Sequence, residues 1–356
     1  YNPYKNYTWE TLIDQSTGKI RSDAKAAWNE NWLDEISDNS AIRTEHIVKS
    51  FDGRVVLDDI SVEFETGKTN LIIGRSGSGK TVLLKTLVGL HEPDSGDVWY
   101  DEVNFSKLGF RERKSIRKDI GMIFQEPMTS LNPVFRIGAQ LDEVIALHDG
   151  EGKSKEEIKE RSIHLLEMAG IANCEGVYNM FPHELSGGMR QRVMIAMALS
   201  CNPKLIIADE PTTALDVTIQ AQILDLLRNL KNKINSSIML ITHDLGVIAE
   251  MADYVVVMYA GRVVEKGTVE EIFANPAHPY TIGLMASKPV VGKKVDKLYS
   301  IPGKVPNPIN MPDYCYFKDR CEMQVEKCCG EYPHMIQLSP THMVSCYRYF
   351  DGKVGE

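Results

Sequence analysis

The segment most informative about the fold is Gly74-Arg-Ser-Gly-Ser-Gly79-Lys80-Thr81. It follows the apolar run Leu71-Ile72-Ile73 and precedes the helix-forming run 82–87. A strand, a glycine-rich turn and a helix start in this order are typical of a phosphate-binding loop, where backbone N–H groups surround phosphate oxygens. An ordinary glycine-rich turn is the alternative, and the flanking strand and helix argue against it.

The chemistry expected of this loop is nucleotide binding with Mg²⁺. Its glycines let backbone N–H groups close around phosphate oxygens, Lys80 supplies positive charge to the terminal phosphates, and the Thr81 hydroxyl can ligate Mg²⁺. The nucleotide-binding residues predicted here are Gly74, Ser76, Gly77, Gly79, Lys80 and Thr81.

Two acids follow a second buried strand. The run 205–208 is apolar and ends in Asp209 and Glu210. Asp209 would lie at the carboxyl end of the strand and hold the water shell of Mg²⁺, and Glu210 would polarise an attacking water. His243 ends another strand-like run, 237–242, and could bond the γ-phosphate. The alternatives are surface charges at a strand end and an ordinary structural histidine.

The rest of the chain alternates strand-like and helical runs. Residues 42–100 are rich in short β runs, 127–182 are mostly helical in pattern, and 204–273 alternate again. We therefore predict an α/β fold with a mainly parallel sheet, an antiparallel β subdomain and a helical insertion. Apolar and aromatic residues recur every four positions over 22–36, which predicts a helix that docks on the main domain. A proline-rich stretch after 289 would be a tether into a small tail.

Composition narrows the function. The chain has 356 residues, with 40 Lys plus Arg and 49 Asp plus Glu, a net charge of −9 that argues against nucleic-acid binding. Hydrophobic residues make up 43%, which is ordinary for a globular protein, and the apolar runs are shorter than a membrane span requires. We expect neither a spanning segment nor a secretion leader, although a start at Tyr1 suggests a partial or processed chain.

At Leu185-Ser-Gly-Gly188 the chain resembles the ATP-binding-cassette (ABC) ATPases, a family of P-loop NTPases. Leu-Ser-Gly-Gly is the signature motif of that family. The resemblance implies that Ser186, Gly187 and Gly188 contact the γ-phosphate of ATP held by an opposite subunit. It implies further roles for Gln125 as the Q-loop glutamine, Asp216 in the D-loop, His243 as the switch histidine and Phe51 as the aromatic stacked on adenine. A core-facing aromatic is the alternative for Phe51.

The resemblance narrows to the ATPases of oligopeptide and dipeptide importers. The segments that carry it are 125–133, 186–198, 208–217 and Asn275-Pro-Ala-His-Pro-Tyr-Thr281. The stretch 74–96 reads more like other importer ATPases, including lipid importers, and residues 1–40 have no counterpart that we identify. These two departures concern the substrate and leave the ATPase prediction as it is.

Five of the seven cysteines lie between 315 and 346. Clustered thiols in an intracellular protein more often bind metal than form disulfides. The spacing lacks the short Cys-x2-Cys pairs of zinc ribbons. Members of the peptide-importer subfamily share this tail, which is associated with a [4Fe–4S] cluster. The resemblance thus implies the ligands Cys315, Cys321, Cys328 and Cys346. Zn²⁺, and unligated or oxidised thiols, remain the alternatives.

The predicted function is an ATP-hydrolysing subunit that powers a peptide importer when ATP brings two cassettes together. Its cofactors would be ATP, Mg²⁺ and the cluster, and its catalytic residues Glu210, His243 and Gln125. Transmembrane permease subunits, a second ABC ATPase and a substrate-binding protein would be its partners at the cytoplasmic face of the membrane. An importer ATPase for a nickel complex or lipid, and a soluble non-transport ABC ATPase, are the alternatives. The predicted domains are 1–40, 41–290 with a helical part at about 127–200, and 291–356.

Overall fold

The structure is a computed structural model that describes most of the chain between Ser40 and Phe350. The described residues are 13–14, 19–20, 40–125, 130–149, 152–213, 215–234, 236–242, 251–287, 299–306 and 311–350. The helix predicted over 22–36 and the switch histidine His243 lie outside these ranges.

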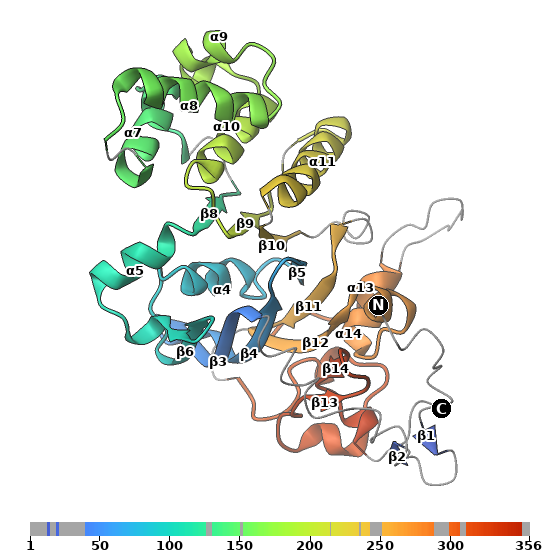
Figure 1. The fold of residues 1–356 in the computed structure, drawn as a ribbon. Helices are drawn as coiled ribbons and strands as arrows, with labels where there is room; N and C mark the ends of the chain where they lie inside the picture. The colour runs from blue at the N-terminus through green and yellow to red at the C-terminus, as the bar shows by residue number, and fades with distance from the viewer. Residues whose placement is uncertain are drawn as a thin grey trace.

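A central eight-stranded sheet organises the described residues (Figure 1). Its strands follow one another in the order β13 (Ile336–Gln337), β14 (Met343–Val344), β12 (Arg262–Thr268), β11 (Tyr254–Tyr259), β5 (Thr69–Ile73), β10 (Ser237–Ile241), β9 (Leu205–Asp209) and β8 (Ile120–Ile123). The five strands from β11 to β8 are parallel, and β12, β14 and β13 continue the sheet in antiparallel pairs. The predicted mainly parallel sheet is confirmed.

The parallel strands are buried on both faces. In β5, Leu71 and Ile73 belong to one hydrophobic core and Ile72 to the other, as the two-residue period of a strand requires. Both faces exclude water, so these strands read as continuous apolar runs in the sequence rather than as alternating patterns.

A second sheet covers one of these faces. It is antiparallel, in the order β4 (Arg54–Glu65), β3 (Ser40–Phe51), β6 (Ser95–Tyr100) and β7 (Val103–Asn104). Helix α4 (Lys80–Leu87) contributes Leu83, Leu84 and Leu87 to a core shared with strand residues of both sheets. The predicted antiparallel β subdomain is therefore present, and it holds the helix that follows the phosphate-binding loop (residues 74–81).

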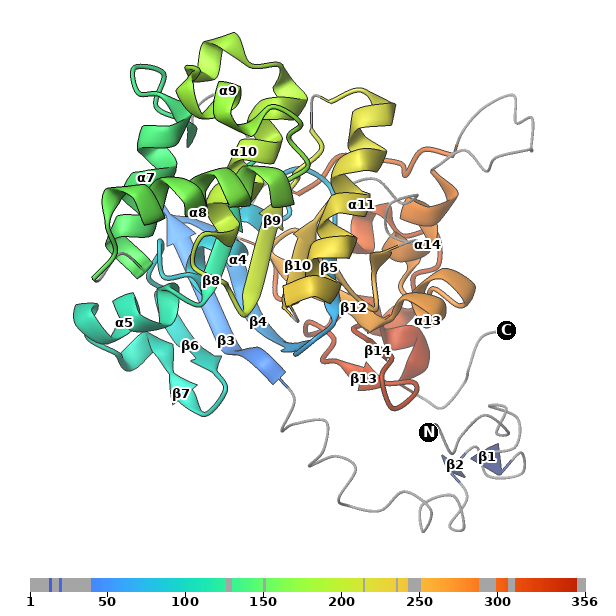
Figure 2. The ribbon, with the colours of Figure 1, turned by 45° about the horizontal axis from the view of Figure 1, so that its top comes forward.

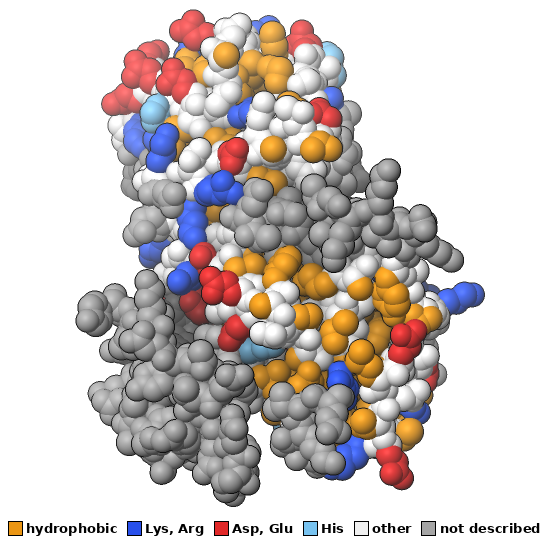
Figure 3. All heavy atoms as spheres, turned by 90° about the vertical axis from the view of Figure 1, so that its right-hand side faces the viewer, with side chains coloured by type: hydrophobic (Ala, Val, Ile, Leu, Met, Phe, Trp, Pro, Cys, Tyr) orange, Lys and Arg blue, Asp and Glu red, His pale blue; other side chains and the backbone are white. Residues whose placement is uncertain are grey.

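A helical lobe stands at one end of the central sheet (Figures 1 and 2). It contains α7 (Ile137–Asp149), α8 (Lys155–Met168), α9 (Cys174–Asn179) and α10 (Gly187–Leu199). The capping box at the start of α8 joins Ser154 and Glu157 through two hydrogen bonds of 2.6 and 3.2 Å. Figure 3 shows acidic side chains along one edge of this lobe, at the top of the view, and hydrophobic side chains on the part of the molecule below it.

The remaining elements include a separate two-stranded antiparallel sheet made of the first two strands. They are β1 (Ile13–Asp14), β2 (Lys19–Ile20), α5 (Phe110–Arg117), α11 (Val217–Ile234), α13 (Val269–Ala274), α14 (Pro279–Ala286) and the 3₁₀ turns η1 (Phe105–Lys107), η2 (Pro182–Glu184), η3 (Lys318–Arg320), η4 (Glu326–Cys329) and η5 (Tyr347–Tyr349). Helix α11 contributes four apolar residues to the core on the sheet face away from α4. None of the helices in the described part of the chain has the length and apolar character that a bilayer crossing requires.

Candidate nucleotide-binding site

The phosphate-binding loop connects the buried end of β5 to the start of α4. Gly74 and Gly79 are required there by close approach of the backbone. A Cβ on Gly74 would overlap the carbonyl oxygen of Met258, and one on Gly79, which has φ +98°, would lie 2.8 Å from the Val56 carbonyl oxygen. The loop therefore packs closely against the backbone of β11 and β4.

Lys80 is the buried cation of this loop. Its Nζ donates hydrogen bonds to the carbonyl oxygens of Gly74, at 2.7 Å, and Arg75, at 3.1 Å. Burial lowers the pKa of Lys80, and the nearby carboxylates of Glu210 and Asp209 oppose that shift. The ammonium group thus lies inside the curve of the loop, where positive charge is needed to bind an anion.

Two carboxylates lie at the carboxyl end of β9, as predicted. Asp209 is 3% exposed, and its Oδ1 accepts a hydrogen bond of 3.3 Å from the Thr81 hydroxyl. Burial raises the pKa of Asp209, while the bond from Thr81 opposes the rise. Because a buried carboxylate is costly without a cation, this pair of hard oxygen donors suits Mg²⁺.

Glu210 connects three segments that are distant in the sequence. Its Oε2 accepts from Gln125 Nε2 at 3.1 Å and from the Thr213 hydroxyl at 2.9 Å. Its backbone N–H donates to the carbonyl oxygen of Ile241 in β10. The structure therefore brings together Gln125 and Glu210, two of the residues that the sequence singled out. Thr213 was missed, because nothing in its local pattern marks it out.

The signature motif, 185–188, lies at the start of α10. The Ser186 hydroxyl accepts from the Met189 N–H at 3.3 Å and so caps the helix, while Ser186 and Gly187 are exposed to solvent. A Cβ on Gly188 would lie 2.8 Å from Ile219 in α11. Asp216, also exposed, caps α11 by accepting from the Ile219 N–H at 3.0 Å.

The predicted adenine contact, Phe51, is at the end of β3. Its side chain is 37% exposed, and the ring makes an edge contact with His91 at 5.1 Å between centroids. The Lys49 ammonium lies 5.3 Å from the ring centroid. The ring is thus open to solvent on part of its surface, unlike the core aromatics of this sheet.

One buried polar atom of the loop has no protein partner. Among the described residues, the Ser78 hydroxyl is buried and makes no hydrogen bond. An orphaned hydroxyl costs free energy unless a ligand or water satisfies it. This atom, together with the buried Asp209 carboxylate, indicates that the site is built for a bound polar group.

The C-terminal cysteines occur as free thiols around η3, η4 and η5. Cys315, Cys328 and Cys346 are buried and Cys321 is partly buried, whereas Cys329 is exposed. Burial raises the pKa of Cys315 to about 12 and that of Cys346 to about 11, and neighbouring thiols of the four add to both shifts. In the described ranges, however, no three His, Cys, Asp or Glu side chains are arranged as a metal centre.

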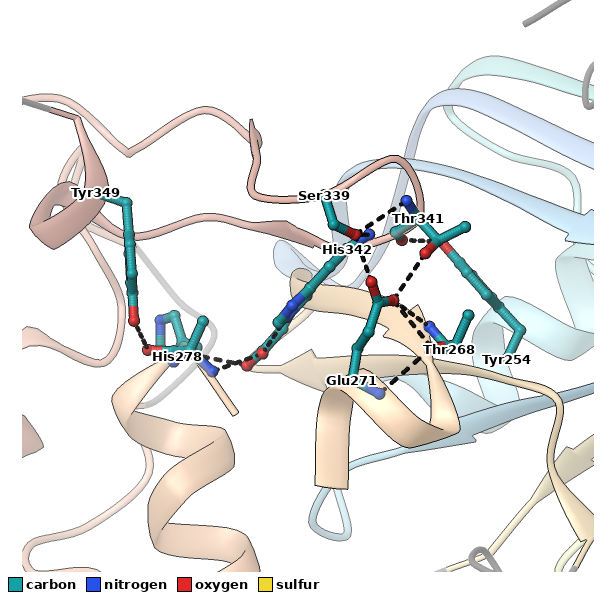
Figure 4. A network of polar contacts seen from close by, with 10 residues as sticks. Tyr254, Thr268, Glu271, His278, Ser339, Thr341, His342 and Tyr349 are labelled. Atoms are coloured by element: carbon teal, nitrogen blue, oxygen red, sulfur yellow. Dashed lines mark hydrogen bonds and ion pairs between the residues drawn. The ribbon is translucent and has the colours of Figure 1, made fainter. Parts of the chain in front are cut away.

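A buried polar network joins the C-terminal segment to the sheet (Figure 4). Glu265 of β12 is fully buried and accepts from the N–H groups of Ala277 and His278 at 2.7 and 2.8 Å. His342 Nε2 lies 2.7 Å from the same carboxylate. The Glu271 carboxylate accepts hydrogen bonds from the hydroxyl of Thr268 at the end of β12 and from those of Ser339 and Thr341 in the C-terminal segment. No local pattern in the sequence predicts these contacts.

Comparison with known proteins agrees with this geometry. The chain matches the ABC transporter family over residues 57–213 and the oligopeptide/dipeptide transporter C-terminal region over residues 264–328. It is 46% identical over 299 residues to the oligopeptide transport ATP-binding protein AppD of Bacillus subtilis, covering 82% of this chain and 90% of the relative. It is 48% identical over 294 residues to the dipeptide transport ATP-binding protein DppD of Lactococcus lactis, covering 81% and 84%.

Solved cassettes share the fold. The dimeric ATP-binding cassette MJ0796, in a post-hydrolysis state bound to ADP and Pi, aligns with a TM-score of 0.59 at 30% identity and covers 64% of this chain and 98% of that one. The chain therefore belongs to the ABC transporter ATP-binding proteins, in their oligopeptide and dipeptide transport branch.

Proposed function

We propose that this chain is the ATP-hydrolysing subunit of a peptide importer. The observation that carries the proposal is the convergence of the loop cation Lys80, the Thr81–Asp209 pair and the Gln125–Glu210 pair at one edge of the sheet. The similarity to oligopeptide and dipeptide transport ATP-binding proteins supplies the substrate class.

Each residue takes a role from its position. Lys80 leaves the loop carbonyls to bind the β- and γ-phosphates, and the N–H groups of the loop, with Ser76 and the glycines, hold the triphosphate. Thr81, Asp209 and Gln125 would hold Mg²⁺, which neutralises phosphate charge when bound. Phe51, whose ring is partly open, stacks on the adenine.

Glu210 is the general base of the proposal. Its carboxylate, held by Gln125 and Thr213, accepts the proton of the attacking water. His243 completes the site by bonding the γ-phosphate. Nothing of its placement is described, so this role rests on the sequence alone.

The exposed signature motif indicates a second cassette as a partner. Ser186, Gly187 and Gly188 would contact the ATP of a second cassette, with Asp216 beside the same junction, and the dimer of the similar cassette MJ0796 supports such an arrangement. Permease subunits would carry the peptide through the membrane, with a substrate-binding protein delivering it. The chain would then lie peripherally at the cytoplasmic face of the membrane.

We also propose the division into an extension (1–40), a cassette (41–290, helical at about 127–200) and a C-terminal part (291–356). The second family match, 264–328, extends across position 290, and β14 pairs with β12 of the cassette. The C-terminal part would accordingly be attached to the edge of the central sheet by strand pairing.

We further propose that Cys315, Cys321, Cys328 and Cys346 hold a [4Fe–4S] cluster as a structural clasp, with Zn²⁺ as the alternative. The support is the donor set: the thiols of Cys315, Cys321 and Cys346 lie close enough to that of Cys328 for it to raise their pKa. Iron, sulfide and zinc analysis of Cys321→Ser against the exposed control Cys329→Ser tests it. Loss of metal in the first variant only is expected, and a metal-free parent protein would contradict it.

The main proposal is tested by Glu210→Gln in the purified complex reconstituted in lipid vesicles. Because a general base contributes about 10²- to 10⁴-fold, hydrolysis and peptide uptake should fall by that order while ATP binding stays intact. Glu156→Gln, an exposed acid in α8, is the matched control. Wild-type turnover in Glu210→Gln contradicts the general base, and ATP-driven uptake of another solute class but not of peptides contradicts the substrate.

A further inference from the structure

The backbone of Arg75, in the phosphate-binding loop, is held by a residue far along the chain. The Arg75 N–H donates a hydrogen bond of 3.0 Å to the hydroxyl of Tyr280 in α14. The Arg75 carbonyl oxygen accepts the 3.1 Å bond from Lys80. Tyr280 is fully buried, so water does not compete for this contact. A phenol oxygen outside the loop thus holds one of the N–H groups that define its curvature.

Tyr280 is itself held in a cluster of three buried aromatics. Its ring lies 4.7 Å from that of Tyr259 and 5.6 Å from that of Phe317, between centroids. The Tyr259 and Phe317 rings meet edge to face at 5.2 Å. Tyr259 ends β11 directly after Met258, whose carbonyl oxygen packs against Gly74. The cluster therefore contacts the loop at Arg75 through Tyr280, and the residue before Tyr259 packs against Gly74.

The C-terminal segment closes this cluster from outside. Arg320, only 5% exposed, donates to the Tyr259 hydroxyl at 3.3 Å and to the carbonyl oxygens of Ile301 and Pro302 at 3.2 and 2.7 Å. Phe317 lies between Cys315 and Cys321 in the sequence. Aromatic packing thus runs from the cysteine-bearing segment to the phosphate-binding loop.

The backbone of Tyr280 is fixed by the polar network of Figure 4. His278 caps α14 by accepting the Tyr280 N–H on Nδ1 at 3.0 Å. The His278 N–H is held by Glu265, which His342 of the C-terminal segment also contacts. Residues 301–342 therefore support Tyr280 in two ways: Phe317 packs against its ring, and His342 belongs to the network that holds its backbone.

We infer that Tyr280 is a positioning residue for the phosphate-binding loop, and that Phe317 makes the cysteine-bearing segment a support of ATP binding. The inference rests on the proposed function, since it assumes that this loop binds ATP. In this role Tyr280 acts through Arg75, whose backbone N–H it holds. Anything that reorganises the segment around Cys315 and Cys321 should then change ATP affinity without altering the chemistry at Glu210.

The test is Tyr280→Phe in the full chain, which removes one oxygen and keeps the ring. Because one buried hydrogen bond is lost, the dissociation constant for MgATP should rise roughly 3- to 10-fold. Turnover at saturating ATP should stay within about twofold of the parent. Hydrogen exchange at the Arg75 amide should become faster. Tyr178→Phe is the matched control, because its hydroxyl bonds Asp142 in the helical lobe and not the loop, and it should leave both readouts unchanged.

Phe317→Leu tests the second half of the inference. It should weaken MgATP binding about twofold or more in the parent but add little in Tyr280→Phe, as expected for coupled residues. Unchanged affinity in Tyr280→Phe, or equal losses in Tyr178→Phe, contradicts the positioning role. If Tyr280→Phe does not fold, unchanged affinity in Phe317→Leu contradicts the inference instead. A parent chain that binds no ATP contradicts the proposed function itself.

Discussion

The phosphate-binding loop and the signature motif differ in what supports them. The loop is held by contacts from β4, β11 and α14, and its Lys80 is buried. The signature motif presents an exposed Ser186 whose hydroxyl satisfies only its own helix, α10. Both are helix N-termini suited to anions. The first is therefore held by contacts from three other elements of this chain, whereas the second is exposed and bonded only within its own helix.

The largest expected difference between the two regions is their response to acid. Burial lowers the pKa of His278, which is 1% exposed, to about 4, although Glu265 opposes the shift. The unfolded chain, with an ordinary histidine pKa near 6.5, takes up the proton first as the pH falls. Stability from this residue is present above about pH 6.5 and is lost as the pH falls toward 4. The support of the phosphate-binding loop should therefore weaken in acid.

Urea unfolding at pH 7 and pH 4.5 measures this effect. His278→Asn is the control, because asparagine can still accept the Tyr280 N–H but does not titrate. The parent should lose about 2 to 3 kcal/mol more than His278→Asn over this interval. Equal losses in the two proteins would mean that His278 is not held neutral by its surroundings.

The second difference concerns ATP binding by the single chain. Lys80→Ala removes a charged donor to phosphate, a contact of about 1.5 to 3 kcal/mol, so the affinity for MgATP should fall roughly 10- to 100-fold. Lys85→Ala, one turn further along α4, is the control and should have a much smaller effect. Equilibrium binding of a fluorescent ATP analogue measures both. Retained affinity in Lys80→Ala would contradict the assignment of the loop.

The smallest expected effect concerns the serine of the signature motif. Ser186→Ala and Ser154→Ala each remove an N-cap serine from the helical lobe, and each should cost about 1 kcal/mol of stability. Only Ser186→Ala should also lower turnover of the assembled complex, by roughly tenfold, because it loses a bond to phosphate. Neither should change ATP binding by the single chain. Equal turnover in the two variants would remove the signature motif from the site.

Much of the site could be predicted because its chemistry is carried by short, continuous segments. The loop 74–81 and the strand end at Asp209 and Glu210 have patterns that imply their positions, since carboxyl ends of parallel strands meet at one edge of the sheet. Tyr280 could not be found in this way. It lies in the segment 275–281, which the sequence marked only through its resemblance to a family, and its contact with Arg75 spans 205 residues.

The parallel strands, the helix starts and the nucleotide loop follow from the sequence, because local periodicity and short motifs specify them. Which distant groups support that loop depends on the folded chain. Buried Glu265, the aromatic cluster around Tyr280 and the addition of β14 to the sheet edge all depend on contacts between segments far apart in the chain. A buried hydroxyl or carboxylate acquires its role from the partners that folding places beside it, and no local pattern specifies those partners.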